Sequence, residues 1–176
     1  HARVLLRTDR NMPRKRYPEL FRAMAPILAA RPDTSLIVHC QTMDQGGDLE
    51  DSLSKYPARI RSQIVCTNAG GRIDRSMLVA LYNAADLYVS NSAEGFGLTI
   101  AESLACGTPA VVMDYSSASE LIGLAPRKPS EPKAVREGSC GLAVRPAGLI
   151  DNEYDHFWAS VDETAFGHAV ARLLDD

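Results

Sequence analysis

Short apolar runs alternate with longer amphipathic stretches along the whole chain. The apolar runs, rich in β-forming residues, predict six strands, at residues 2–8, 35–40, 63–67, 86–92, 109–114 and 140–146. Between them, apolar residues at helical spacing predict helices, at residues 12–33, 48–60, 74–85, 97–106, 117–123 and 162–176. Residues 124–138, with three prolines and six charges, predict an exposed loop.

Some details of these helices follow from single residues. Pro18 and Pro26 predict an irregular first turn and a kink in the first helix. Asp74 is a candidate N-cap of the helix at 74–85. The apolar spacing in that helix predicts four inward-facing side chains, which are Met77, Leu78, Leu81 and Tyr82.

The predicted strands are apolar at nearly every position, not at every second one. Strands of this kind are typical of a parallel sheet that is covered by helices on both faces. We therefore predict one doubly wound, Rossmann-like α/β domain spanning residues 1–176. Such sheets bind ligands at the carboxyl ends of their strands, and each candidate stretch below follows a predicted strand directly.

Composition narrows the possible partners. The net charge of −3 gives no global basic field that would attract nucleic acid or a membrane surface. No apolar run reaches the ~20 residues of a membrane span, and no signal peptide is visible. Four scattered cysteines, without a C-x-x-C pair, indicate buried free thiols in a reducing cytosol, so we expect a cytoplasmic protein: Cys40, Cys66, Cys106 and Cys140. The first residue is not Met and directly precedes a strand, so we expect a piece of a larger protein.

A basic cluster follows the first predicted strand and precedes the first helix. It contains Arg7, Arg10, Arg14, Lys15 and Arg16. Basic side chains at the start of a helix add to its free backbone N–H groups and suit a phosphate ligand. The alternative is a solvated basic helix end, since Lys and Arg are normally exposed.

A second candidate stretch, "SAEGFG", follows the fourth predicted strand. Gly95 and Gly97 would let the backbone turn sharply and approach a ligand. The next helix would then offer unpaired amides to an anion, those of Phe96, Gly97, Leu98 and Thr99. Glu94 adds a negative charge there, and two accounts remain open. It either stabilises the helix end by ~0.3–1 kcal/mol or accepts hydrogen bonds from ligand hydroxyls.

Glu102 is the only charged residue between Gly95 and Val112. Its neighbours in the predicted helix are almost all small or apolar, which predicts a mostly buried helix. A buried lone carboxylate costs several kcal/mol unless it finds polar partners. A ligand hydroxyl at the strand ends would serve as that partner.

These stretches resemble a known family. Residues 93–112, "AEGFGLTIAESLACGTPAVV", resemble the E-x₇-E signature of retaining glycosyltransferases of family 4, which have the GT-B architecture. Residues 10–15, "RNMPRK", resemble the arginine and lysine that follow the first strand of that family's C-terminal domain. Residues 78–92 and 161–174 also resemble family segments in the expected order.

The resemblance implies that this chain is the donor-binding half of a GT-B enzyme, without the N-terminal acceptor domain. The sugar of a nucleoside-diphosphate sugar would contact Glu94, and its ribose would contact Glu102. Arg10 and Lys15 would neutralise the departing diphosphate, which the glycine loop would hold through Gly95 and the amides of Phe96, Gly97, Leu98 and Thr99. The base would lie near Thr67 and Asn68. The resemblance implies no metal or other cofactor, and the chain has no D-x-D motif.

The resemblance therefore implies a retaining hexosyltransferase when the protein is complete. The isolated domain would be inactive, and any membrane contact would lie in the absent half. Two alternatives stay open, a nucleotide-sugar 2-epimerase and a nucleotide-binding or interaction module without catalysis. The acceptor, the linkage, the sugar and the base cannot be inferred from these residues.

Overall fold

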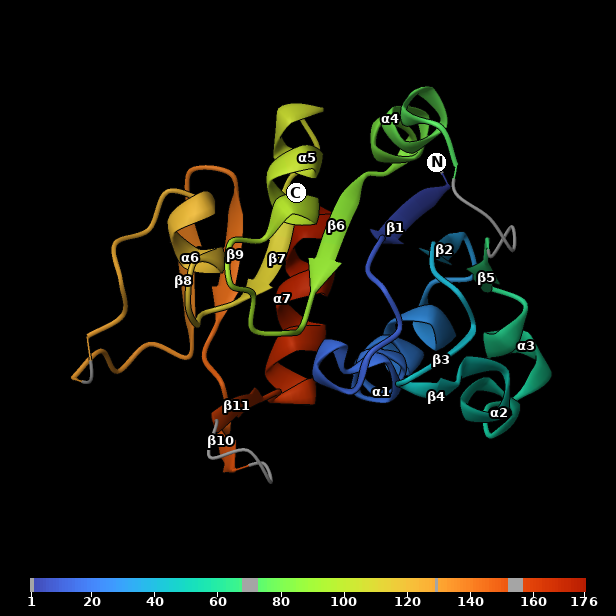
Figure 1. Ribbon diagram of the computed structural model, residues 1–176, viewed down its shortest axis with the longest axis horizontal. Coiled ribbons are helices and arrows are strands. Elements are labelled where there is room, and N and C mark those ends of the chain that lie inside the picture. The colour runs from blue at the N-terminus through green and yellow to red at the C-terminus, as the bar shows by residue number, and fades with distance from the viewer. Residues whose placement is uncertain (1, 68–72, 129, 152–156) are drawn as a thin grey trace.

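The structure is a computed structural model that describes residues 2–67, 73–128, 130–151 and 157–176 (Figure 1). Its centre is a seven-stranded sheet in the order β5-β2-β1-β6-β7-β9-β8. In sheet order the strands are β5 (Ile64–Cys66), β2 (Thr34–Val38), β1 (Arg3–Arg7), β6 (Leu87–Ser90), β7 (Ala110–Met113), β9 (Gly141–Val144) and β8 (Val135–Gly138). All neighbouring pairs are parallel except β8 and β9. The predicted α/β fold with a mostly parallel sheet is confirmed.

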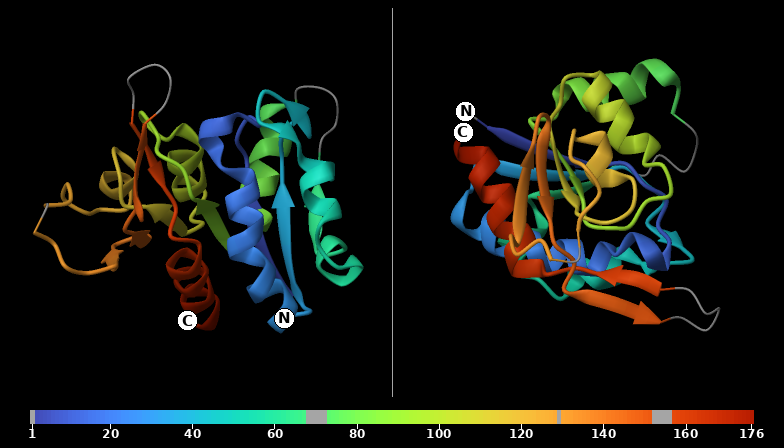
Figure 2. Two further views of the ribbon diagram at one scale, coloured as in Figure 1. Left: turned by 90° about the horizontal axis from the view of Figure 1, so that it is seen from below. Right: turned by 90° about the vertical axis from the view of Figure 1, so that its left-hand side faces the viewer.

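Helices cover both faces of this sheet (Figure 2). The helices are α1 (Tyr17–Ala30), α2 (Leu49–Ser54), α3 (Ala58–Arg61), α4 (Arg75–Ala84), α5 (Leu98–Ala105), α6 (Ala118–Leu121) and α7 (Glu163–Asp175). One apolar core joins α1, α2, α3 and α7 to one face, and a second core joins α4, α5 and α6 to the other. Because successive strand residues point to opposite faces, β1 supplies Leu5 to the first core and Leu6 to the second.

The chain winds outward in two directions from the middle of the sheet. From β1 it goes to β2 and β5, and it then returns to β6 and continues to β7 and β9. The order of strands therefore reverses between β1 and β6. This topological switch point is where doubly wound sheets bind their ligands, at the carboxyl ends of the strands.

The described residues also contain two short hairpins and a 3-10 turn. The hairpins pair β3 (Met43–Asp44) with β4 (Gly47–Asp48), and β10 (Gly148–Asp151) with β11 (Phe157–Ser160). A 3-10 turn at Pro13–Lys15 precedes α1. No helix among the described residues is both long and apolar enough to cross a membrane.

Several sequence predictions differ from the structure at the level of single elements. The helix predicted at 48–60 is two short helices, because Pro57, the N-cap of α3, carries no amide hydrogen for a continuous helix. Asp74 caps α4 as predicted, accepting a hydrogen bond from the amide of Met77 at 2.8 Å. The Met77 side chain itself is 55% exposed, so its predicted inward position is wrong. Tyr82 is buried as predicted, and it is the residue that anchors α4.

All four cysteines are free, but they are not all buried. Cys40 is buried, whereas Cys66 and Cys106 are half-buried. Cys140 is exposed, which corrects the prediction for that residue, because it lies in the turn that connects β8 to β9. Burial raises the pKa of the Cys40 thiol to about 11.

The prediction of an exposed loop over residues 124–138 is partly wrong, because its last four residues form the edge strand β8. The loop is held to the sheet by Asp114, whose side chain is fully buried at the end of β7. Its carboxylate accepts hydrogen bonds from Arg136 at 2.5 and 2.7 Å and from Ser119 at 2.7 Å, and it also pairs with Arg127. Burial alone would raise the pKa of Asp114, but these donors lower it below its usual value.

We expect the Asp114→Asn substitution to lower the free energy of unfolding at pH 7 by about 3 kcal/mol, because it leaves two nearly buried arginines without their carboxylate. The folded-state pKa of Asp114 lies below its unfolded value, which is about 3.9. Its stabilising effect is therefore present above that value and is lost as the pH falls through the folded-state pKa. Urea titrations from pH 7 to the lowest pH at which the wild type stays folded measure the difference.

The matched control is Asp175→Asn, which removes the partner of Arg31 from an exposed ion pair. This control should change stability by no more than about 0.5 kcal/mol. An equal loss in both variants would contradict the anchoring role of Asp114.

Candidate functional site

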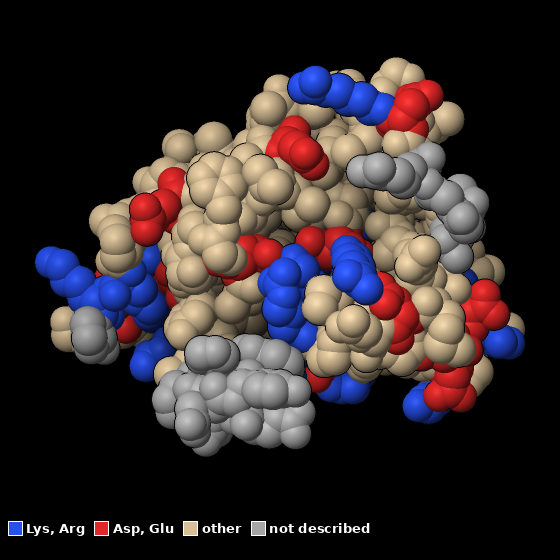
Figure 3. Space-filling view, in the orientation of Figure 1, with Lys and Arg blue, Asp and Glu red and all other residues tan. Residues whose placement is uncertain are grey.

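Four loops at the carboxyl ends of the strands meet around the switch point. They follow β1, β2, β6 and β7 and carry Asp9, His39, Glu94 and Ser116 respectively. Basic and acidic side chains lie side by side at the centre of the face shown in Figure 3. The predicted ligand edge of the sheet is therefore densely charged.

A buried ionic network connects the loops on the two sides of the switch point. The Lys15 ammonium lies 2.6 Å from Asp9 Oδ1 and 2.6 and 2.7 Å from the two carboxylate oxygens of Glu94. Asp9 Oδ2 lies 2.8 Å from Arg7 Nη2. Ser92 donates a hydrogen bond to Glu94 at 2.7 Å and accepts one from Arg7 at 2.7 Å. All five side chains are buried, which requires that their charges be paired.

The network explains the ionisation of its members. Burial alone would lower the pKa of Arg7, but the nearby Asp9 carboxylate, with smaller effects of Tyr88, Tyr17 and Glu94, raises it above its usual value. Burial would likewise raise the pKa of Asp9, but Arg7 and Lys15 hold it below its usual value. Both groups therefore carry full charge at neutral pH.

The basic cluster predicted from the sequence divides into two parts. Arg7 and Lys15 are buried, so the alternative of a solvated basic helix end is wrong for them. The Arg14 side chain is 42% exposed and lies 3.5 Å from Glu94 Oε2. The Arg10 side chain is 59% exposed and pairs with Asp44. The two exposed arginines of the cluster, Arg10 and Arg14, lie at the border of the candidate site.

The glycine loop between β6 and α5 has one conformationally demanding residue, Gly97. Its φ of +87° is rare for residues with side chains, and a Cβ there would lie 2.9 Å from Leu121 Cδ1. Gly95 has no such φ, and a Cβ there would meet no atom within 4 Å, so the turn itself does not require glycine at this position. Ser117 fastens the loop by donating to the carbonyls of Glu94 at 3.1 Å and Phe96 at 2.8 Å.

The loop leads directly into the first turn of α5. Gly97 is the N-cap, so the amides of Leu98 and Thr99 have no acceptor within the helix. Phe96 and Leu98 are 61% and 67% exposed, so this helix end is open to a ligand. Glu94 lies before this turn, and its carboxylate is bound to Lys15 rather than to the helix end.

Glu102 is exposed, so the prediction that it lies in a buried part of its helix is wrong. The small residues around it in α5 leave its side chain at the sheet edge. Tyr82 donates a hydrogen bond to Glu102 Oε2 at 2.8 Å. A partner exists as expected, but it comes from α4 of the chain itself.

A cavity of about 270 Å³ lies beside these residues. Its lining combines predicted and unpredicted residues, namely Thr8, Asp9, Arg10, His39, Cys40, Gln41, Ile73, Leu78, Tyr82, Thr99 and Glu102. Thr67 lies next to it, with its hydroxyl 2.9 Å from His39 Nδ1. The other residue predicted near the base, Asn68, lies outside the described residues.

Asp9 and Tyr82 are site residues that the sequence reasoning did not single out. Asp9 follows an apolar strand within two residues, so a search for polar residues at strand ends would have found it. Tyr82 was predicted only as an inward-facing helix residue, and its contact with Glu102 depends on the packing of α4 against α5.

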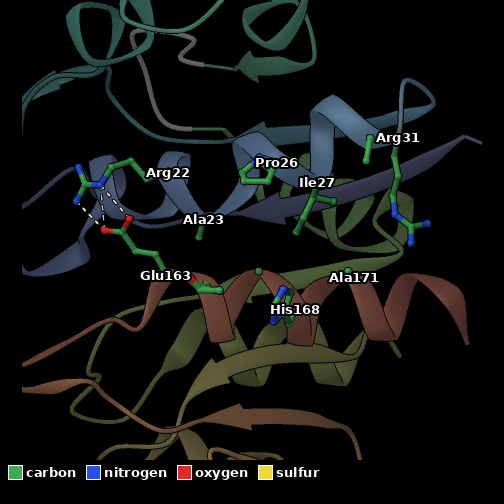
Figure 4. Close-up of a pocket in the computed structure, with 11 residues that line it drawn as sticks. Arg22, Ala23, Pro26, Ile27, Arg31, Glu163, His168 and Ala171 are labelled. Atoms are coloured by element: carbon green, nitrogen blue, oxygen red, sulfur yellow. Dashed lines mark hydrogen bonds and ion pairs between the residues drawn. The ribbon is translucent and has the colours of Figure 1, made fainter.

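Two other hollows lie apart from the ionic network. One, of about 430 Å³, is bordered by Gly95, Tyr115, Ser116, Glu120 and Arg127 among others. The other, of about 400 Å³, is a groove between α1 and α7, with the Arg22–Glu163 ion pair at one end and His168 on its wall (Figure 4). None of the predicted site residues that the structure describes lines this groove. In the described part of the chain, no group of three or more His, Cys, Asp or Glu side chains is arranged to hold a metal ion.

The fold and the charged switch point define a doubly wound α/β domain with its candidate site at the carboxyl edge of the sheet. Comparison with known families identifies it further. Residues 2–128 match the family model described as "Glycosyl transferases group 1". The chain belongs to this family, which confirms the predicted relationship.

The chain is also similar to individual curated proteins. It is 33% identical to a D-inositol 3-phosphate glycosyltransferase of Thermobispora bispora over 99% of this chain and 36% of that protein. It is 25% identical to a GDP-mannose-dependent phosphatidylinositol monomannoside mannosyltransferase of Corynebacterium glutamicum over 68% of this chain and 31% of that protein. The chain thus spans about a third of the length of these relatives.

Solved structures show the same fold at low sequence identity. The alpha,alpha-trehalose 6-phosphate synthase of Burkholderia multivorans matches 98% of this chain with a TM-score of 0.65 at 17% identity, and 35% of that structure is covered. A GtfA/B complex matches 99% of this chain with a TM-score of 0.64 at 19% identity, and 29% of that structure is covered. These matches confirm the predicted GT-B type of fold.

The two glycines of the loop provide a matched test of its geometry. We expect Gly97→Ala to lower the free energy of unfolding by about 1–2 kcal/mol, because alanine is disfavoured at this φ. Gly95→Ala should change it by no more than about 0.5 kcal/mol. Urea unfolding of the two variants measures both values, and an equal loss at the two positions would show that the loop geometry is wrong.

Proposed function

We propose that this chain is the donor-binding domain of a retaining glycosyltransferase that uses a nucleoside-diphosphate sugar. The observation that carries the proposal is the arrangement at the switch point. Arg10, Thr99 in the first turn of α5 and Glu102 line one cavity together with Asp9. Asp9 is bound to Lys15, which in turn is bound to Glu94, so the buried ion pair adjoins that cavity. Family membership and the names of the relatives support a glycosyl transfer reaction.

The proposed binding mode follows from the charges. The diphosphate takes the amides of Leu98 and Thr99, where the helix dipole favours an anion. Arg10 lies on the same cavity and supplies a planar guanidinium for phosphate oxygens. Stabilisation of the departing diphosphate is what a glycosyl transfer needs, since negative charge develops there as the bond to the sugar breaks. The base takes the side of the cavity near His39 and Thr67.

Lys15 has a particular position in this proposal. An ammonium has three N–H donors, and three carboxylate oxygens, one of Asp9 and two of Glu94, lie within 2.7 Å of it. Lys15 can therefore turn to a phosphate only by releasing Glu94. Glu94 then becomes free to accept hydrogen bonds from the sugar hydroxyls. Binding of the donor exchanges one ion pair for two new charged interactions.

Retention of configuration is proposed from the resemblance of residues 93–112 to the E-x₇-E signature. Acceptor binding is assigned to the part of the protein beyond this chain, so we expect the 176-residue chain alone to transfer no sugar. A 2-epimerase is the second candidate. A product assay on the complete protein separates the two, because an epimerase changes the sugar without an acceptor.

We expect the chain to bind a nucleoside diphosphate without added divalent metal, because its own cations can neutralise the anion. Isothermal calorimetry with UDP, GDP and ADP in the presence of EDTA measures this binding. Heat that appears only after Mg²⁺ or Mn²⁺ is restored would contradict the metal-free part of the proposal. Absence of binding to all three nucleotides under both conditions would contradict the donor-binding function.

The two glutamates should respond differently to substitution. Glu102→Ala should weaken binding of the free nucleoside diphosphate and of the nucleotide sugar alike, by tenfold or more. The substitution removes a charged hydrogen bond to the ribose that both ligands carry, and such a bond contributes ~1.5–3 kcal/mol. Glu94→Gln should leave binding of the free diphosphate unchanged or tighter, because Lys15 is released from a charged partner. The same variant should selectively weaken binding of the nucleotide sugar.

Calorimetry of both variants with UDP, GDP or ADP and the matching sugar nucleotide measures the effects. Glu94 has a buried partner in Lys15, so the thermal midpoint of each variant must stay close to that of the wild type. If both variants lose the free diphosphate equally, the assignment of the two carboxylates is wrong.

A further inference from the structure

The guanidinium of Arg10 is oriented although most of its side chain is exposed. Its Nε lies 2.7 Å from Asp44 Oδ2 and its Nη2 lies 3.2 Å from Asp44 Oδ1, so the carboxylate holds one edge of the guanidinium. An arginine has five N–H donors in a fixed planar arrangement. This pairing leaves the other edge free for a second anion and fixes the plane in which that edge lies.

Asp44 is a firm anchor, in contrast to most surface carboxylates. Its side chain is only 10% exposed. Its Oδ1 also accepts a hydrogen bond from the amide of Gln45 at 2.8 Å. The backbone of the β3–β4 hairpin thus also holds the carboxylate, through the same oxygen that contacts Arg10 Nη2.

The hairpin is in turn attached to the loop that carries Arg10. The buried amide group of Asn11 donates hydrogen bonds to the carbonyls of Thr42 at 3.0 Å and Gly47 at 2.8 Å. The amide of Gly46 donates to the Asn11 carbonyl at 3.1 Å. A Cβ on Gly46 would lie 2.1 Å from Asn11 Oδ1, so the turn approaches the loop as closely as its backbone allows. The hairpin and the Arg10 loop therefore form one unit.

We propose that Asp44 is a positioning residue that orients Arg10 toward the diphosphate of the donor. This inference rests on the proposed function and extends it to a residue outside the cavity lining. Arg10 faces the cavity that also contains Thr99 and Glu102, so the oriented guanidinium lies at the phosphate side of the proposed site. Because Asp44 already orients Arg10 before a ligand binds, binding loses less side-chain entropy. This smaller loss is the physical basis of the expected gain in affinity.

Charge alone predicts the opposite effect, and this makes the inference testable. Asp44 is an anion near the proposed binding place of another anion. If it acts only through its charge, its neutralisation should tighten binding of a nucleoside diphosphate. If it orients Arg10, its neutralisation should weaken binding. The sign of the change therefore separates the two roles.

The experiment measures binding of UDP, GDP and ADP to the wild type, Asp44→Asn, Arg10→Ala and the double variant. We expect Asp44→Asn to lower the affinity for the tightest-binding nucleotide by roughly three- to tenfold. This is the effect expected when one long side chain, that of Arg10, must be immobilised on binding. In the Arg10→Ala background the same substitution should have no effect. The control is Asp51→Asn, which removes a carboxylate from an exposed pair with Lys55 on α2 and should leave binding unchanged.

The outcomes distinguish this inference from the proposed function. If the wild type binds none of the three nucleotides, the proposed function is wrong. If the wild type binds and Arg10→Ala weakens binding, but Asp44→Asn has no effect or tightens it, only the positioning role is overturned. Equal weakening by Asp44→Asn with and without Arg10 would also overturn it, because Asp44 would then not act through Arg10. The thermal midpoint of Asp44→Asn should match the wild type, since the pair is largely exposed on the arginine side.

Discussion

The buried ammonium of Lys15 is the interaction on which the geometry of the site depends. It lies between a carboxylate that follows β1 and another that follows β6, the two strands at which the sheet order reverses. Two buried carboxylates that contact the same atom need a cation between them, because unpaired buried charges are costly. Arg7, fully buried below Asp9, completes the pairing from inside the sheet. The two loops are therefore fixed relative to each other by charge as well as by the sheet.

The ionic network also determines which kind of ligand can separate Lys15 from Glu94. A buried ion pair contributes little net stability, since desolvation offsets much of the attraction, but breaking it without a substitute is costly. A ligand that separates Lys15 from Glu94 must therefore offer both groups new partners at once. A phosphate for the ammonium and hydroxyls for the carboxylate meet that condition, whereas inorganic phosphate offers only the first. The resting ion pair thereby favours a ligand with both chemical features.

The alternation of apolar runs and helical patterns was enough to predict the fold, because strands buried on both faces must be apolar throughout. It failed at β8, an antiparallel edge strand whose four residues include Arg136 and Glu137 and are not fully buried. Arg136 is needed there to pair with Asp114, and that partner directly follows another strand, β7. Such a pairing between distant segments leaves no periodic signal in the sequence.

The site shows the same limit. Resemblance and the position after a strand were sufficient to single out Glu94, Lys15 and Arg10, and the structure brings them to one edge of the sheet. Their partners could not be predicted in this way. Asp9 and Glu94 share one ammonium across a separation of 85 residues, and the partner of Glu102 comes from a neighbouring helix. The exposure of Glu102 was misjudged because small residues around a charge indicate close packing as readily as an open edge.

The two cations that the sequence singled out differ in how they are held, and the difference bears on their roles. Lys15 is buried and already paired with Asp9 and Glu94, so in the proposal its charge becomes available to a ligand through exchange with Glu94. Arg10 is exposed and keeps one edge of its guanidinium unused by Asp44. In the proposed binding mode, an anion can therefore pair with Arg10 without breaking an existing ion pair. In the same proposal, the exchange at Lys15 occurs only for a ligand that also carries hydroxyls for Glu94, so the exposed cation would attract the anion and the buried one would discriminate between ligands.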